Sequence, residues 1–171
     1  MTELRYEPDK WNQNIFIRKS HNCYSYALNL IEVKRTSKCK KKKTVSKKNI
    51  CLRKHPMDKM KQFEFHSCSE LISSILEEFP KIKKVHKLTL VPDGYYRVAL
   101  FLLNRKDHHH LSLNDFHFYR QDSNGYWSHK DGWRKATNKD KTGKLITDPE
   151  SVEKKNNSQL CTYFIFPIRK T

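Results

Sequence analysis

The sequence is poor in glycine and has no long hydrophobic run, and both shortages narrow the kind of protein it can be. Glycine occupies 4 of 171 positions while 36% of residues are hydrophobic, so the chain is neither fibrous nor of low complexity and should fold. The longest apolar run is too short to cross a membrane. The N-terminal stretch MTELRYEPDK lacks the apolar core of a signal peptide. We therefore expect one domain, residues 1–171, located in the cytoplasm.

Closely spaced cysteine pairs are also missing. The five cysteines are an odd number without any CxxC motif: Cys23, Cys39, Cys51, Cys68 and Cys161. This count and spacing disfavour both a disulfide framework and a structural zinc site. The run Asp107-His108-His109-His110 is a poor metal site, because adjacent histidines on an extended chain point in opposite directions. The sequence predicts a protein of a reducing compartment that needs no metal and no cofactor.

Acidic residues are outnumbered by basic ones. The chain has 35 Lys and Arg against 18 Asp and Glu, which gives a formal charge of +17 and a pI near 9.7. Such a charge attracts polyanions, but it does not distinguish nucleic acid from an anionic membrane surface or an acidic protein. A lysine-rich stretch at about residues 34–49 is typical of a solvated loop, which could also bind nucleic acid or an anionic membrane.

Hydrophobic spacing divides the chain into a helical first part and a strand-rich second part. Residues 1–20 are typical of an extended lead-in, and apolar residues from 23 to about 32 fall on one helical face. Ser67 and Glu70 form a capping box that opens a second helix. A period of two then predicts strands at 87–91, 95–103, 116–121, 126–129 and 160–167. Short turns between them predict an antiparallel sheet packed on the first helix, an α+β fold.

The candidate chemistry centres on Cys23, which opens the first predicted helix. The N–H groups and partial positive charge of a helix start favour thiolate over thiol. His117 lies in a predicted strand and shares a face with Tyr119. If that face packs against the helix, the imidazole can meet the Cys23 sulfur. The next strand ends in His129, which could accept the second N–H of His117 and orient the ring.

Each of these residues also has a purely structural interpretation. Cys23 could be a buried apolar side chain, because packing is the common role of a lone cysteine. His117 could be a strand residue whose nitrogens bond to the main chain, and His129 a surface residue. Three aromatic residues in the same region could line a substrate groove or fill the core: Tyr126, Trp127 and Trp133.

The arrangement resembles the NlpC-like branch of the papain superfamily, known for cell-wall peptidases. In that branch a cysteine opens a helix, a histidine begins a strand, and a second histidine or polar residue ends the next strand about a dozen residues later. Here His129 follows His117 by twelve residues. The resemblance implies Cys23 as nucleophile, His117 as base and later acid, and His129 as the orienting residue. It covers the Cys23 helix and residues 115–129 best.

The residues around Cys23 depart from that family. An acidic residue usually precedes the cysteine and Ser-Gly follows it, whereas this chain has Asn22 before it and Tyr24-Ser25 after it. The main-chain N–H of Cys23 and the side chain of Asn22 are therefore the candidate oxyanion donors. Other residues could replace His129 as the third member, and the sequence does not rank them: Asp131, Asn138, Asp140 and Asp148.

The resemblance implies a papain-like cysteine hydrolase acting on an amide, isopeptide or ester bond of a peptide, protein or acyl-bearing substrate. A viral or phage origin would fit so lysine-rich a small enzyme. The alternative is a catalytically inactive basic module that contacts nucleic acid or an anionic membrane through its lysine-rich loop.

Overall fold

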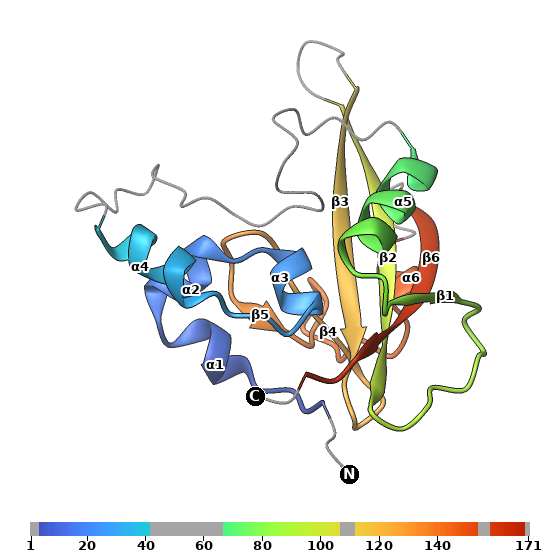
Figure 1. Cartoon of the computed structure of the whole chain (residues 1–171), viewed down its shortest axis with the longest axis horizontal. Helices are drawn as coiled ribbons and strands as arrows, with labels where there is room; N and C mark the ends of the chain where they lie inside the picture. The colour runs from blue at the N-terminus through green and yellow to red at the C-terminus, as the bar shows by residue number, and fades with distance from the viewer. Residues whose placement is uncertain (1–3, 42–66, 107–111, 154–157, 170–171) are drawn as a thin grey trace.

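A computed structural model describes residues 4–41, 67–106, 112–153 and 158–169. Figure 1 shows the N-terminal helices gathered beside the β4–β5 end of a twisted sheet, with α5 lying over the long central strands. The helices are α1 (Pro8–Asn12), α2 (Ile15–Ser20), α3 (Cys23–Ala27), α4 (Val33–Lys41), α5 (Cys68–Glu78) and α6 (Pro149–Glu153). The strands are β1 (Lys83–Val85), β2 (Tyr95–Lys106), β3 (Ser112–Gln121), β4 (Trp127–Lys130), β5 (Ala136–Thr137) and β6 (Ser158–Pro167).

The strands form one sheet in the order β1-β6-β2-β3-β4-β5, and every neighbouring pair is antiparallel. The predicted α+β class is thereby confirmed. Four of the five predicted strands are present as β2, β3, β4 and β6. The prediction for 87–91 is wrong, since the strand lies earlier, at β1. Leu88 and Leu90 supplied the alternating pattern there, yet both are exposed at 81% and 89%.

The helical part of the chain differs more from the prediction. The predicted extended lead-in is wrong for residues 8–20, because α1 buries Trp11 completely and Asn14 caps α2 by accepting hydrogen bonds from main-chain N–H groups. Residues 1–3 lie outside the described residues. The helix that begins at Cys23 is short, and Asn29 turns the chain with φ 49°. The start of the predicted lysine-rich loop is helical, as α4, while residues 42–49 lie outside the described residues.

The sheet is covered on both faces. One face carries Phe116 and Phe118, which pack in the main core with α3 and α5. The opposite face carries Tyr119 in a second core, against which α6 packs through Val152. His117 alternates onto this second face and contacts the Tyr119 ring. The prediction that His117 and Tyr119 share a face is confirmed, but the other face of β3 packs against the Cys23 helix.

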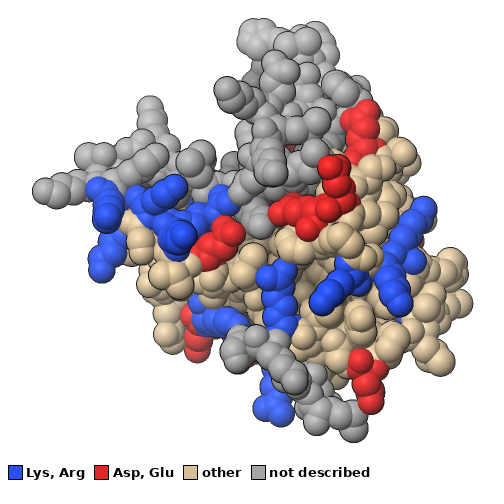
Figure 2. Space-filling view, viewed as in Figure 1, with Lys and Arg blue, Asp and Glu red and all other residues tan. Residues whose placement is uncertain are grey.

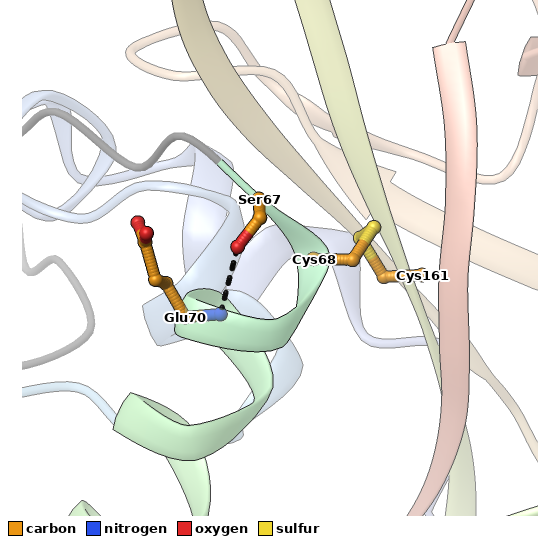
Figure 3. The surroundings of a disulfide bond; sticks show 4 residues. All are labelled: Ser67, Cys68, Glu70 and Cys161. Atoms are coloured by element: carbon orange, nitrogen blue, oxygen red, sulfur yellow. Dashed lines mark hydrogen bonds between the residues drawn. A yellow bond between two sulfur atoms is a disulfide. The ribbon is translucent and has the colours of Figure 1, made fainter.

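The prediction that the cysteine count and spacing disfavour disulfide bonds is also wrong. Cys68, the first residue of α5, is disulfide-bonded to Cys161 in β6, next to the Ser67 cap (Figure 3). Cys39 is likewise disulfide-bonded, whereas Cys23 is not. Cys68 and Cys161 are 93 residues apart in sequence, but the fold brings their Cα atoms to 5.1 Å. Cys51 lies outside the described residues. The argument for a reducing compartment from the cysteine pattern no longer holds.

Within the described parts of the chain, no helix is both long and apolar enough to cross a membrane.

Candidate functional site

Cys23 is the first residue of α3, as predicted. Asn22 is the N-cap, and its Oδ1 accepts a hydrogen bond from the Ser25 main-chain N–H at 3.2 Å. Asn22 therefore acts first as a helix cap, a role its residue type favours, and only its amide NH₂ could still donate to an oxyanion. Cys23 itself is 4% exposed.

The segment before Cys23 is held by two buried basic side chains. Lys130, at the end of β4, is fully buried, and its Nζ donates to the carbonyl oxygens of Arg18, His21 and Gly132, each at 2.7 Å. The Nε2 of His21 accepts from the main-chain N–H of Glu32 at 2.9 Å. Burial lowers the pKa of His21 and so favours the neutral ring that this bond requires.

Sequence reasoning missed the role of Lys130. The alternation of side chains along the predicted strand could have indicated it. Ser128 and Lys130 lie on one face of that strand, and Trp127 and His129 lie on the other. Lys130 thus had to point toward the helices, where a charge needs partners.

The Cys23 side chain packs in the main core, on the face of the sheet opposite to His117, and its sulfur approaches the main chain of β3. Its Sγ is 3.8 Å from the carbonyl oxygen of Phe116, to which the thiol donates. β4 pairs with β3 only from Tyr119 to Gln121, so it does not cover the strand at Phe116. The sulfur thus contacts the main chain of the residue that directly precedes His117, although α3 packs on the other face.

His117 and His129 are directly hydrogen-bonded. The Nε2 of His117 lies 2.8 Å from the Nδ1 of His129, and the rings are nearly perpendicular at 84°. Strand pairing explains the contact, since His129 is opposite Tyr119 in β4 and His117 is two residues earlier on the same face. The structure thus brings together the two histidines that the sequence singled out.

The environment of His129 assigns the proton in this bond. Burial, followed by the neighbouring charge of His117, lowers the pKa of His129 to about 3, so its ring is neutral. The main chain of Lys139 favours protonation through a hydrogen bond, which means that it presents a carbonyl oxygen to the ring. Nδ1 of His129 is then the acceptor, and the Nε2–H of His117 donates to it. When His117 is neutral, its basic lone pair is then on Nδ1, and when it is charged both of its ring nitrogens carry protons.

A tyrosine and a buried glutamate support the histidine pair. The Tyr119 ring stacks on His129 with centroids 4.7 Å apart, and its hydroxyl donates to Glu153 Oε1 at 2.6 Å. Ser158 donates to the other oxygen of Glu153 at 2.7 Å. Burial, reinforced by Glu153, raises the pKa of Tyr119, so the phenol remains protonated. Glu153 was missed because α6 was not predicted.

The rival third residues have other roles. Asp140 Oδ1 accepts from the N–H groups of a turn that follows it. Asp148 pairs with Lys87 at 3.2 Å and accepts from the N–H of Glu150 in the first turn of α6. The Asn138 main-chain oxygen accepts from Ile146 in a β-bridge region.

Asp131 lies nearer to the histidine pair. It contributes to the electrostatic environment of His129, but its side chain is half exposed and lies 3.7 Å from Arg134. Of the three aromatic candidates for a groove, Trp127 is buried in the second core, Tyr126 is half-buried and Trp133 is 50% exposed.

A pocket of about 410 Å³ opens beside the histidine pair. We call it the histidine pocket. Its lining includes His117, Tyr119, His129, Arg134, Lys135 and Lys139. Among the described residues, no three histidine, cysteine or acidic side chains are grouped to hold a metal ion, and the His108–His110 run lies outside them.

Basic side chains gather over α2 and α4. Figure 2 shows this group of lysines and arginines on the face viewed there. The two helices supply Arg18, Lys19, Lys34, Arg35, Lys38, Lys40 and Lys41. We call this set the basic surface.

Comparison with known proteins yields a partial match to a shell protein. The insoluble matrix shell protein 1 of Ruditapes philippinarum is 52% identical over 40 residues, which are 23% of this chain. The chain spans about a quarter of that protein's length, 27%. No known family profile and no solved structure matches the chain.

Proposed function

We propose that the protein is a papain-like cysteine hydrolase in which Cys23 is the nucleophile, His117 the base and His129 the orienting residue. The observation that carries the proposal is the 2.8 Å bond between His117 and a neutral, half-buried His129. It fixes the His117 ring and directs its basic nitrogen away from His129. Cys23, at a helix start against the preceding residue of β3, is the nucleophile that best fits this base.

The reaction begins with transfer of the Cys23 proton to Nδ1 of His117. The helix start and the resulting imidazolium both stabilise the thiolate. The imidazolium then carries two N–H groups, and the bond from Nε2 to His129 keeps its plane fixed while it forms. His129 acts as a hydrogen-bond acceptor in this step and remains uncharged.

The thiolate attacks the carbonyl carbon of an amide, isopeptide or ester bond. The main-chain N–H of Cys23 and the side-chain amide of Asn22 are the donors proposed for the oxyanion. His117 returns its proton to the leaving atom, and water then releases the acyl group from sulfur. The residues proposed for these steps require no cofactor.

The test measures the rate of Cys23 alkylation by iodoacetamide between pH 5 and 9, followed by mass spectrometry of the Cys23 peptide. An ordinary thiol has a pKa of about 8.5, so an activated Cys23 should react at a pH well below this value. We expect His117→Ala to move the profile toward 8.5 and to lower the rate at pH 7 by about tenfold. His86→Ala removes an exposed histidine elsewhere and should leave the profile unchanged.

A second measurement tests turnover rather than reactivity. The wild-type protein should release p-nitrophenol from p-nitrophenyl acetate with an initial burst, because the acyl group accumulates on sulfur. Cys23→Ala should abolish the burst. Identical pH profiles for wild type and His117→Ala, together with no burst, would exclude the hydrolase.

The basic surface supports the second candidate, an inactive module that binds nucleic acid or an anionic membrane. The chain has a net charge of +17. The affinity of such a module for a single-stranded oligonucleotide or for phosphatidylserine vesicles should therefore fall steeply as the salt concentration rises. The binding module is favoured over the hydrolase if the Cys23 alkylation profile is that of an ordinary thiol and the protein binds the oligonucleotide or the vesicles tightly.

A further inference from the structure

We infer that the histidine pocket binds the leaving group of the substrate and selects one that carries a carboxylate. The inference rests on the proposed hydrolase function, since a leaving group exists only if a bond is cleaved. It concerns the chemical class of the substrate, about which the arrangement of Cys23 and the histidines alone says nothing.

The position of the pocket follows from the path of the proton. When sulfur attacks an amide, the S–C bond forms, the C–N bond breaks, and the proton taken from Cys23 passes through His117 to the leaving nitrogen. Water then cleaves the thioester to a carboxylic acid and restores the thiol. The leaving amine must therefore be next to the imidazole, and the pocket is lined by His117 and His129.

The carboxylates of the pocket are engaged by protein groups. Glu153 accepts from two hydroxyl groups, and Asp140 accepts from main-chain N–H groups of its turn. Asp131 lies 3.7 Å from Arg134. Glu153 and Asp140 are thus occupied by protein donors, while the half-exposed Asp131 is next to the positive charge of Arg134, so all three are poor partners for a cationic ligand.

Lysine side chains from both sides of β5 give the pocket an anion-binding character. Lys135 directly precedes the strand and Lys139 follows it closely, and both are exposed and line the pocket. An ammonium group on a flexible stem can reach a ligand carboxylate. The excess positive charge of the chain raises the local concentration of anions further. An amine that bears a carboxylate, such as an acidic residue or a chain terminus, fits these groups.

The probes are glutarate and its neutral diamide, glutaramide, which share a shape and differ in charge. Binding is followed by the NMR signals of the His117 and His129 rings, with sodium chloride keeping the ionic strength constant. We expect saturable shifts with glutarate and at least about threefold weaker binding of glutaramide. Equal binding of the two probes would overturn the inference.

Lysine variants locate the binding. Lys135→Gln combined with Lys139→Gln should weaken glutarate binding by about threefold. Lys83→Gln combined with Lys84→Gln removes the same charge from β1, at the opposite edge of the sheet, and should have no such effect. If both double variants weaken binding equally, only the overall charge is involved and the pocket is not a site.

The alkylation of Cys23 separates the two proposals. If Cys23 is activated but the histidine signals do not respond to glutarate, the proposed hydrolase function is retained and the proposed substrate class is rejected. A glutarate response with an ordinary Cys23 thiol would remove the hydrolase, and with it any leaving group. The pocket would then be an anion site of another kind.

Discussion

Lys130 shows how one buried side chain can hold in place the segment that leads to Cys23. Its ammonium joins carbonyl groups of α2, of the segment before Cys23 and of the loop after β4. Three charge-assisted bonds satisfy the three N–H donors of the ammonium, which is the condition for burying it at an acceptable free energy.

Lys130→Met should lower the free energy of unfolding by about 2–4 kcal/mol, because the variant leaves buried carbonyl groups without donors. Urea unfolding provides the measurement. Lys84→Met, at an exposed position of β1, is the control and should change stability by less than about 0.5 kcal/mol. Equal effects at the two positions would contradict the role given to Lys130.

His129 makes stability depend on pH. Its folded pKa of about 3 lies below the ordinary value near 6.5, so the unfolded chain binds the proton first as pH falls. The stability contributed by neutral His129 is thus complete above about pH 6.5 and decreases from there toward pH 3.

Between pH 7 and pH 5, protonation of His129 in the unfolded chain lowers the free energy of unfolding by at most about 2 kcal/mol. His129→Gln retains a neutral acceptor that does not titrate, so the stability of this variant should fall less over that range in urea unfolding. His86→Gln, at an exposed position, should retain the wild-type pH dependence. A wild-type dependence in His129→Gln would show that the pKa of the His129 ring is not lowered in the folded protein.

At the scale of elements, α5 follows its sequence closely. Ser67 caps the helix by accepting from the Glu70 N–H at 3.2 Å (Figure 3). Leu71 and Ile75 face the main core. Spacing, cap and buried face were all predicted, because each depends on residues only three or four positions apart.

Ser67→Ala should lower the free energy of unfolding by about 1 kcal/mol and the melting temperature by about 2–4 °C. Ser73→Ala is a matched control on the exposed side of the same helix, where alanine has the higher helix propensity and should stabilise slightly. Thermal unfolding of both variants measures the difference, and a loss of stability in Ser73→Ala equal to that in Ser67→Ala would argue against the cap.

At the scale of the whole molecule, the Cys68–Cys161 disulfide ties α5 to β6, a strand of the sheet on which it packs. It closes a loop with a sequence separation of 93 residues, so it restricts the unfolded chain strongly. The odd count of cysteines was misleading because pairing depends on distance in the fold, and neither residue has a cysteine nearby in sequence.

Cys161→Ala should lower the free energy of unfolding by about 2–5 kcal/mol under non-reducing conditions. A non-reducing digest of the wild type should contain the Cys68 and Cys161 peptides as one linked species, detected by mass spectrometry. Separate peptides in that digest, and equal stability of the two proteins, would contradict the disulfide.

Local patterns in the sequence were sufficient for the strands β2, β3, β4 and β6, for α5, and for the face shared by His117 and Tyr119. They also predicted that His129 lies near His117, since strand alternation and a short turn fix the pairing register of β3 and β4. The sequence alone therefore determined an antiparallel α+β protein with a paired histidine site and an excess of positive charge.

Only the tertiary structure decided which face of β3 meets α3, where the Cys23 sulfur lies, and that Lys130, Glu153 and the disulfide complete the surroundings. These features depend on contacts between segments far apart in the chain. No short sequence window contains both partners of such a contact, so its geometry follows from how all the layers pack together.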